Sequence, residues 1–211
     1  MTPTVLGLDL ALEKTGIATA TGVCFTSVGG RGDARLDRLY RDVYEAASVA
    51  DLVIMEDLPT TAMSAGLTGR AHGVVRLALH RLSKPIVTVP PASLKAFATG
   101  KGAADKAMMA AALVGEFNLD QGDMIEVDAR GRQFVPVFGL ELTDDNQVDA
   151  FYLRQMGLYW LRARRDAGAS TGPPPGASGL DPRRTAVLFG VNVRTGKAKI
   201  DWRQWEGALD E

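Results

Sequence analysis

The chain has 211 residues, a formal net charge of −1 at pH 7, 46% hydrophobic and 23% charged residues. This length suits one main domain with a small appendage, and the composition excludes disordered and fibrous proteins. No apolar run approaches the roughly 20 residues that span a bilayer, and no secretory leader opens the chain, so we expect a cytoplasmic protein. A single cysteine, Cys24, excludes an internal disulfide and favours a small core residue.

The first 90 residues predict strands and helices in alternation. Residues 4–29 alternate apolar runs with turn signals, which predicts two or three antiparallel strands. Residues 34–50 have the apolar spacing of an amphipathic helix. The run 51–57 is typical of a buried parallel strand, 72–82 of a helix, and 85–90 of another strand. We therefore expect an α/β fold whose mixed central sheet, antiparallel first and then parallel, is flanked by helices.

The middle of the chain predicts further helices around a weakly patterned stretch. Residues 92–98 indicate a short helical turn, and a glycine break separates it from a helix that begins near Ala103. Residues 118–142 are rich in glycine and aspartate, which favours a loop or small hairpin. A strong helical pattern then begins at about Asp144.

A composition break divides the last 46 residues from the rest. Residues 166–182 are rich in glycine, proline and serine and predict a linker between a main domain, 1–165, and a basic C-terminal extension, 183–211. The extension is predicted to form a strand, a turn and a second strand. Two roles stay open for this hairpin: following a DNA backbone, or covering a sheet edge.

Three acidic residues interrupt elements that are otherwise apolar. Asp9 lies within the first strand, Glu56 ends the run 51–57, and Asp149 lies within the last core helix. A buried carboxylate is unfavourable by several kcal/mol unless a cation or donor compensates it. Two strands and a crossing helix can bring these acids to one sheet edge, where hard oxygen ligands favour Mg²⁺ or Mn²⁺. Asp57 is an alternative to Glu56, because successive strand residues face opposite ways.

The helix that contains Asp149 offers a fourth ligand. Asp145 lies four residues before Asp149 and Asn146 three before, so either can share its face. Such a set could hold two metal ions about 3.5 to 4 Å apart, the spacing used in phosphodiester displacement.

A glycine-rich loop precedes the helix near Ala103. Gly100 and Gly102 allow close approach of a phosphate, Lys101 and Lys106 supply positive charge, and the helix N-terminus adds amide donors. Lys106 could stabilise charge on a reacting phosphate. The alternative is an ordinary glycine break between two helices.

These segments occur in the order and approximate spacing of a known family. Residues 4–160 resemble the RuvC-type Holliday junction resolvases, in particular the bacteriophage and actinobacterial-prophage branch. The most specific element is 100–106, which resembles the family's Gly-x-Gly-x-Ala-x-Lys signature, with Lys95 as the upstream basic residue. The matching segments are GLDLALEKTGIA, VIMED, VPPASLKAFATGKGAADKAMM and DDNQVDAFYL.

The resemblance implies an RNase H-like fold in which Asp9, Glu56 and Asp149 are the first, second and last catalytic carboxylates. Asn146 stands where the bacterial enzyme has its third acid, so three alternatives stay open for the fourth metal ligand: Asp145, the amide oxygen of Asn146, or a group that holds the metal only through water. A second departure is Pro59, where the bacterial enzyme has an aromatic residue. The DNA-binding residues that the resemblance implies are Lys95, Gly100, Lys101, Gly102 and Lys106.

The resemblance also implies the activity: paired nicks in a four-way DNA junction that leave 5′-phosphate and 3′-hydroxyl ends. We expect two Mg²⁺ ions in each active site, with Mn²⁺ able to substitute, and a homodimer with two such sites. The helix 70–82 is a candidate for the dimer surface. Two alternatives stay open: another RNase H-like nuclease that acts on RNA or general branched DNA, and a junction-binding scaffold without catalysis.

Overall fold

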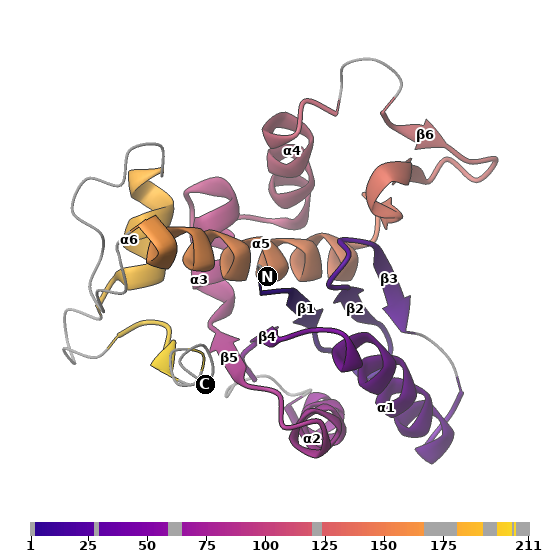
Figure 1. The fold of residues 1–211 in the computed structure, drawn as a ribbon. Coiled ribbons are helices and arrows are strands. Elements are labelled where there is room, and N and C mark those ends of the chain that lie inside the picture. The colour runs from indigo at the N-terminus through magenta and orange to yellow at the C-terminus, as the bar shows by residue number, and fades with distance from the viewer. Residues whose placement is uncertain are drawn as a thin grey trace.

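Figure 1 shows the fold as a ribbon. The structure is a computed structural model, and it describes residues 3–27, 30–58, 65–119, 124–166, 181–191, 198–203 and 205. Within these ranges, no helix combines the length and apolar character needed to cross a membrane.

The central sheet has five strands and the predicted mixed pattern. Its strands are β1 (Val5–Asp9), β2 (Thr15–Ala18), β3 (Cys24–Ser27), β4 (Leu52–Glu56) and β5 (Ile86–Val89). They lie in the order β3-β2-β1-β4-β5. The first three form an antiparallel meander, and β4 and β5 are parallel to β1. The centre of the sheet is therefore the pair β1 and β4.

Helices cover both faces of this sheet (Figure 1). One face packs against α1 (Asp33–Ser48) and α2 (Ala65–Arg81). The other packs against α3 (Pro91–Thr99), α4 (Lys106–Glu116) and the long α5 (Asp145–Asp166). The alternation of strand side chains divides the core into these two layers.

Two glycines let α5 lie directly on the sheet. A Cβ at Gly7 of β1 would overlap the carbonyl oxygen of Ala150, and one at Gly16 of β2 would overlap that of Asn146. Gly16 is paired with Asp9 in the antiparallel register. The helix backbone is therefore closest to the sheet beside the end of β1.

The stretch 118–142 contains more structure than the sequence predicts. A small antiparallel sheet forms from β6 (Glu126–Val127), β7 (Gln133–Val135) and β8 (Leu140–Glu141). A short 3₁₀ turn, Pro136–Phe138, connects the last two strands. Two- and three-residue strands are too short to give a period in the sequence.

The prediction that α4 begins near Ala103 is wrong by one turn. The helix begins at Lys106, because the Asp105 side chain accepts a hydrogen bond from the Met108 N–H, 2.8 Å away, and caps it. Lys106 is thus the first residue of the helix.

The prediction that the extension begins with a strand is also wrong. Residues Pro182–Phe189 form a helix, α6, and only an isolated antiparallel bridge joins Val191 to Ala198. Asp181 caps this helix by accepting a hydrogen bond from the Arg183 N–H, 2.8 Å away, and Pro182 suits its first turn. The linker predicted at 166–182 lies almost entirely outside the described residues.

The described part of the extension belongs to the main core. Trp202 stacks on Trp160 of α5 with ring centroids 5.1 Å apart, and Trp205 meets Trp160 edge-on. The Trp205 indole donates a hydrogen bond to the Val53 carbonyl of β4, 3.2 Å away. Burial of these rings ties the extension to α5 and the sheet.

Candidate active site

Two carboxylates lie side by side at one edge of the central sheet. Asp9 ends β1 and Glu56 ends β4, and these parallel strands pair with Leu8 opposite Met55. The next residues along each strand, Asp9 and Glu56, therefore point to the same face. The two carboxyl groups are close enough for a hydrogen bond to form between them.

The register also distinguishes Glu56 from Asp57. Glu56 lies two residues after Ile54 in β4, so the two side chains point to the same face of the sheet, and Ile54 packs in the core layer under α5. Asp57 is exposed, and its carboxylate accepts a hydrogen bond from the Leu58 N–H, 2.9 Å away. Glu56 is therefore the acid that faces Asp9 and α5.

The first turns of α5 add two acids to this edge. Asp149 is half-buried, and both Glu56 and Asp145 raise its pKa. Asp149 and Asp145 in turn raise the pKa of Asp9. Four carboxyl groups from three elements thus act on one another electrostatically.

This concentration of acids perturbs their protonation. Burial, followed by repulsion from Glu56 and Asp149, holds the pKa of Asp9 well above its ordinary value. Burial, followed by repulsion from Glu56 and Asp145, raises the pKa of Asp149 to about 7. Burial also raises the pKa of Glu56. Raised pKa values mean that the site has too little positive charge to stabilise the ionised acids. A bound cation would supply that charge.

Asp145, and not Asn146, lies beside the other acids. The Asn146 side chain donates a hydrogen bond to the Asp144 carboxylate, 3.3 Å away, and its backbone N–H donates to the same oxygen at 3.1 Å. Asp145 instead forms an ion pair with Lys106 and interacts with Asp9 and Asp149. Of the alternatives that the sequence leaves open, the geometry favours Asp145.

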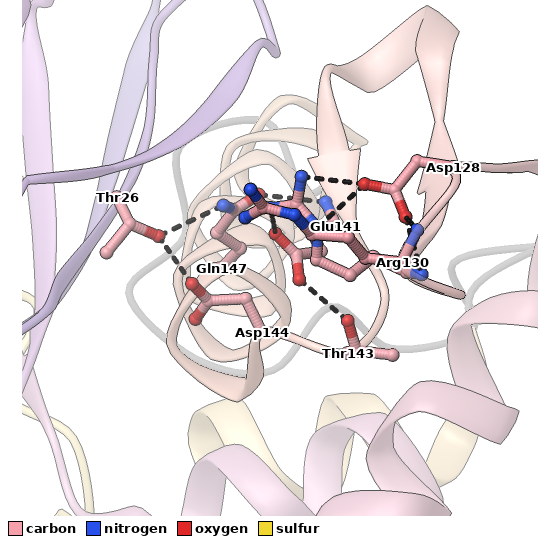
Figure 2. Close-up of polar contacts among 8 residues, drawn as sticks. Thr26, Asp128, Arg130, Glu141, Thr143, Asp144 and Gln147 are labelled. Atoms are coloured by element: carbon pink, nitrogen blue, oxygen red, sulfur yellow. Dashed lines mark hydrogen bonds and ion pairs between the residues drawn. The ribbon is translucent and has the colours of Figure 1, made fainter.

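A buried polar network fixes the start of α5 (Figure 2). The Thr26 hydroxyl of β3 donates to the Asp144 carboxylate at 2.8 Å and accepts from the Gln147 amide at 3.0 Å. The Gln147 carbonyl oxygen accepts from the Glu141 N–H of β8 at 2.9 Å. Asp144 and Gln147 are only 8% and 7% exposed, so these contacts hold Asp145 and Asp149 in register with the sheet.

The same network extends into the small sheet. Arg132 forms ion pairs with Asp128 at 2.7 Å and with Glu141 at 3.4 Å, and Thr143 donates to Glu141 at 2.7 Å. The small sheet, for which the sequence gives only a weak signal, thus supports the helix that carries two of the acids.

Two lysines border the carboxylates. Burial raises the pKa of both Glu56 and Asp149, and the charge of Lys95, on α3, offsets part of this rise. Lys106 is 79% exposed, and its ion pair with Asp145, followed by attraction to Asp149 and Asp9, raises its pKa. Both lysines therefore lie beside the acids, and the Lys106 side chain is exposed to solvent.

The glycine loop lies between these two lysines in the chain. Gly100 ends α3 in the left-handed conformation, with φ of 80°. Lys101 and Gly102 are exposed. All five residues that the sequence assigns to DNA binding thus lie on α3, on the loop or at the first residue of α4.

The residues present suit a divalent cation by chemistry and charge. Four carboxylates supply hard oxygen donors and more negative charge than two lysines balance. Among the described residues, no three acidic, histidine or cysteine side chains already surround one point at ligand distance.

Some contributions to the site escape sequence reasoning. Gly7 and Gly16 admit α5, and Thr26, Asp144 and Gln147 fix its start. The available signal is two glycines at positions that would otherwise carry strand side chains facing the helix. Pro59, the second departure from the bacterial pattern, lies outside the described residues.

Comparison with known proteins finds a protein that is similar in sequence to part of this chain. The crossover junction endodeoxyribonuclease RuvC of Sorangium cellulosum (strain So ce56) is 44% identical over 66 residues, which are 31% of this chain and 35% of that protein. The match thus spans about a third of the curated relative. No family model matches the chain.

Solved structures extend the likeness to most of the fold. Thermus thermophilus RuvC in complex with a Holliday junction substrate aligns with a TM-score of 0.53 and 17% identity, over 75% of this chain and 95% of that one. A second T. thermophilus RuvC structure gives a TM-score of 0.52 and 16% identity with the same coverage. The chain therefore has the mixed α/β fold of the T. thermophilus RuvC structures, and over about a third of its length it is similar in sequence to the S. cellulosum RuvC.

Proposed function

We propose that the protein is a metal-dependent, structure-selective endonuclease that resolves four-way DNA junctions by paired nicks. The observation that carries this proposal is the convergence of Asp9, Glu56 and Asp149 at one sheet edge, with the pKa of each raised by burial. Perturbed acids grouped beside basic residues are typical of active sites. The resolvase relatives support DNA as the substrate.

In this proposal, Asp9, Glu56, Asp149 and Asp145 hold two Mg²⁺ ions, and Mn²⁺ can replace them. Bound metal supplies an activated water for attack on phosphorus and stabilises the leaving 3′-oxygen, which gives 5′-phosphate and 3′-hydroxyl ends. Asn146 stays outside this set because its amide is bonded to Asp144.

The other residues of the site bind and orient the DNA strand. Lys95 and Lys106 place two charges beside the acids, and Lys106 reaches into solvent where a phosphate would lie. Gly100, Lys101 and Gly102 allow the adjacent phosphate to approach the backbone. In the proposed reaction Lys106 leaves Asp145 for the scissile phosphate and stabilises its developing charge.

Paired nicks on symmetric strands require two active sites in a two-fold arrangement. We propose a homodimer, and α2 is the candidate for its interface, because it lies on the opposite sheet face from the acids. Its exposed Leu77 is 47% accessible.

The test is cleavage of a labelled immobile four-way junction beside linear duplex, flap and RNA substrates, with Mg²⁺ or EDTA. We expect symmetric, ligatable nicks in the junction only with metal. Asp149→Asn should reduce cleavage by at least about 100-fold, the upper range for loss of a group that only supports a metal ligand. The control is Asp57→Asn, because Asp57 is a neighbouring acid that faces away from the site.

The same experiment separates the alternatives. Preferential cleavage of RNA or of all branched DNA would replace the resolvase assignment with another RNase H-like nuclease. Tight junction binding without cleavage in either metal would favour a junction-binding scaffold without catalysis. The motivation for this alternative is Asn146, which stands where the bacterial enzyme has its third acid.

A further inference from the structure

Helix α6 carries two adjacent arginines in opposite environments. Arg184 is 18% exposed, and its two Nη atoms each lie 2.6 Å from a carboxylate oxygen of Glu116, at the end of α4. Its Nε donates to the Phe97 carbonyl of α3 at 3.2 Å, and its guanidinium lies 4.6 Å from the Phe97 ring centroid. Arg184 therefore fixes α6 to both helices that flank the glycine loop.

Arg183 lies on the other side of this anchor and is 76% exposed. A Cβ at Gly100 would lie 3.4 Å from its Nη1 atom, so the guanidinium is directly beside the glycine loop. Its partner is Asp181, 3.1 Å away, which also caps the helix. Helix α6 thus presents an exposed guanidinium, paired with Asp181, where α3 ends.

A hollow lies between α6, α3 and the glycine loop. Val187 of α6 lines this hollow of about 520 Å³ together with Gly102 of the loop and Ser93 of α3. Lys199 of the extension also lines this hollow. The remaining lining is apolar: Pro90, Ala92, Ala96 and Ala198. The lining is thus mostly apolar and includes the basic Lys199. Arg183 lies one helical turn before Val187, and the exposed Lys101 precedes Gly102 in the chain.

We propose that the α6 groove, which we define as this hollow, lined by Val187, Gly102 and Lys199, together with the neighbouring Arg183, binds the sugar-phosphate backbone of the junction arm that leaves the active site. Arg183 and Lys199 contact successive parts of the backbone, and the apolar lining packs against sugars. The inference rests on the proposed function and extends it, because it gives the C-terminal extension a direct role in substrate binding. Charge complementarity and continuity with the glycine loop support a nucleic-acid occupant.

The first test measures junction binding in EDTA over a range of salt concentrations, for wild type, Arg183→Gln and Arg41→Gln. Arg41 is a matched control: it is 68% exposed and paired with Asp37, but lies on α1 across the sheet. We expect Arg183→Gln to weaken binding about 3- to 10-fold and to reduce the salt slope by about 0.9, the loss of one phosphate contact. Arg41→Gln should keep both wild-type values.

The second test locates the DNA directly. Cys24 is the only cysteine in the sequence, it is 2% exposed, and burial raises the pKa of its thiol to about 12. Arg183→Cys and Arg41→Cys can therefore be labelled selectively with a thiol-reactive aryl azide. Photolysis on a labelled four-way junction should crosslink the first variant and leave the second without crosslinks.

The outcomes separate this inference from the proposed function. If wild type binds the junction but Arg183→Gln matches Arg41→Gln and position 183 does not crosslink, the groove proposal is overturned and the nuclease proposal stands. If wild type neither binds nor cleaves any junction, both proposals fail. Equal weakening by both substitutions would also overturn the groove, because it would reflect overall charge alone.

Discussion

The two ends of α5 are held in place by different physics. At the N-terminal end, Thr26, Asp144 and Gln147 fix the helix through hydrogen bonds. They lie beside acids whose pKa values are raised by burial and by mutual repulsion. At the C-terminal end, Trp160 is fully buried in a cluster with two tryptophans of the extension. The comparison teaches that one helix can derive its stability from aromatic packing at one end and carry buried acids with raised pKa values, available for function, at the other.

The aromatic end should dominate stability. Trp160→Ala removes a fully buried indole and should lower the free energy of unfolding by about 3–5 kcal/mol. Urea denaturation measures the loss. Junction cleavage by the fraction that remains folded at low temperature should stay near wild type, since the acids lie several turns away. A loss below about 1 kcal/mol would show that the extension does not pack as described.

The acidic end should behave in the opposite way. In EDTA at pH 8, Asp149→Asn removes a buried charge whose pKa is raised to about 7, so we expect stability to rise by about 1–3 kcal/mol. The same substitution should abolish cleavage. A clear loss of stability in metal-free buffer would contradict the electrostatic description of this end.

The pH dependence sharpens the comparison. Burial raises the pKa of Asp149 in the folded protein to about 7, whereas the ordinary pKa of an aspartate is 3.8. Between these two pH values the unfolded state therefore binds fewer protons than the folded state. Stability of the metal-free protein should therefore fall as pH rises from about 4 to 7, by about 1–3 kcal/mol from this group. Urea midpoints at pH 5 and pH 8 in EDTA measure the effect, and Asp149→Asn should flatten it. A midpoint that rises with pH would contradict the raised pKa.

The smallest effect concerns the polar network. Thr26→Val keeps the shape of the side chain but removes the hydroxyl between Asp144 and Gln147, which should lower stability by about 1–2 kcal/mol. Cleavage should fall more than this loss explains, because the start of α5 positions Asp145 and Asp149. Thr21→Val on the exposed β2–β3 turn is the control. Equal effects of the two substitutions would remove the positioning role from the network.

The sequence predicts much of this arrangement for identifiable reasons. Asp9 and Glu56 interrupt apolar runs, and parallel strands bring the ends of such runs together, so their proximity follows from pattern. The choice between Asp145 and Asn146 does not, because it depends on which side chain bonds to Asp144. For α6 the sequence predicts a strand, because its β-branched residues favour one. The Asp181 cap, Pro182 in the first turn and tertiary packing stabilise a helix instead.

The most direct test of the central claim is single-turnover cleavage of one immobile four-way junction by wild type and Asp149→Asn, each with Mg²⁺ and with EDTA, alongside their urea midpoints. The account predicts that only wild type with Mg²⁺ introduces paired nicks, while the metal-free variant is at least as stable as metal-free wild type. Cleavage that persists in EDTA would contradict it, because the reaction would then need no metal. Cleavage that persists in the variant would also contradict it, because Asp149 would then have no role in the chemistry.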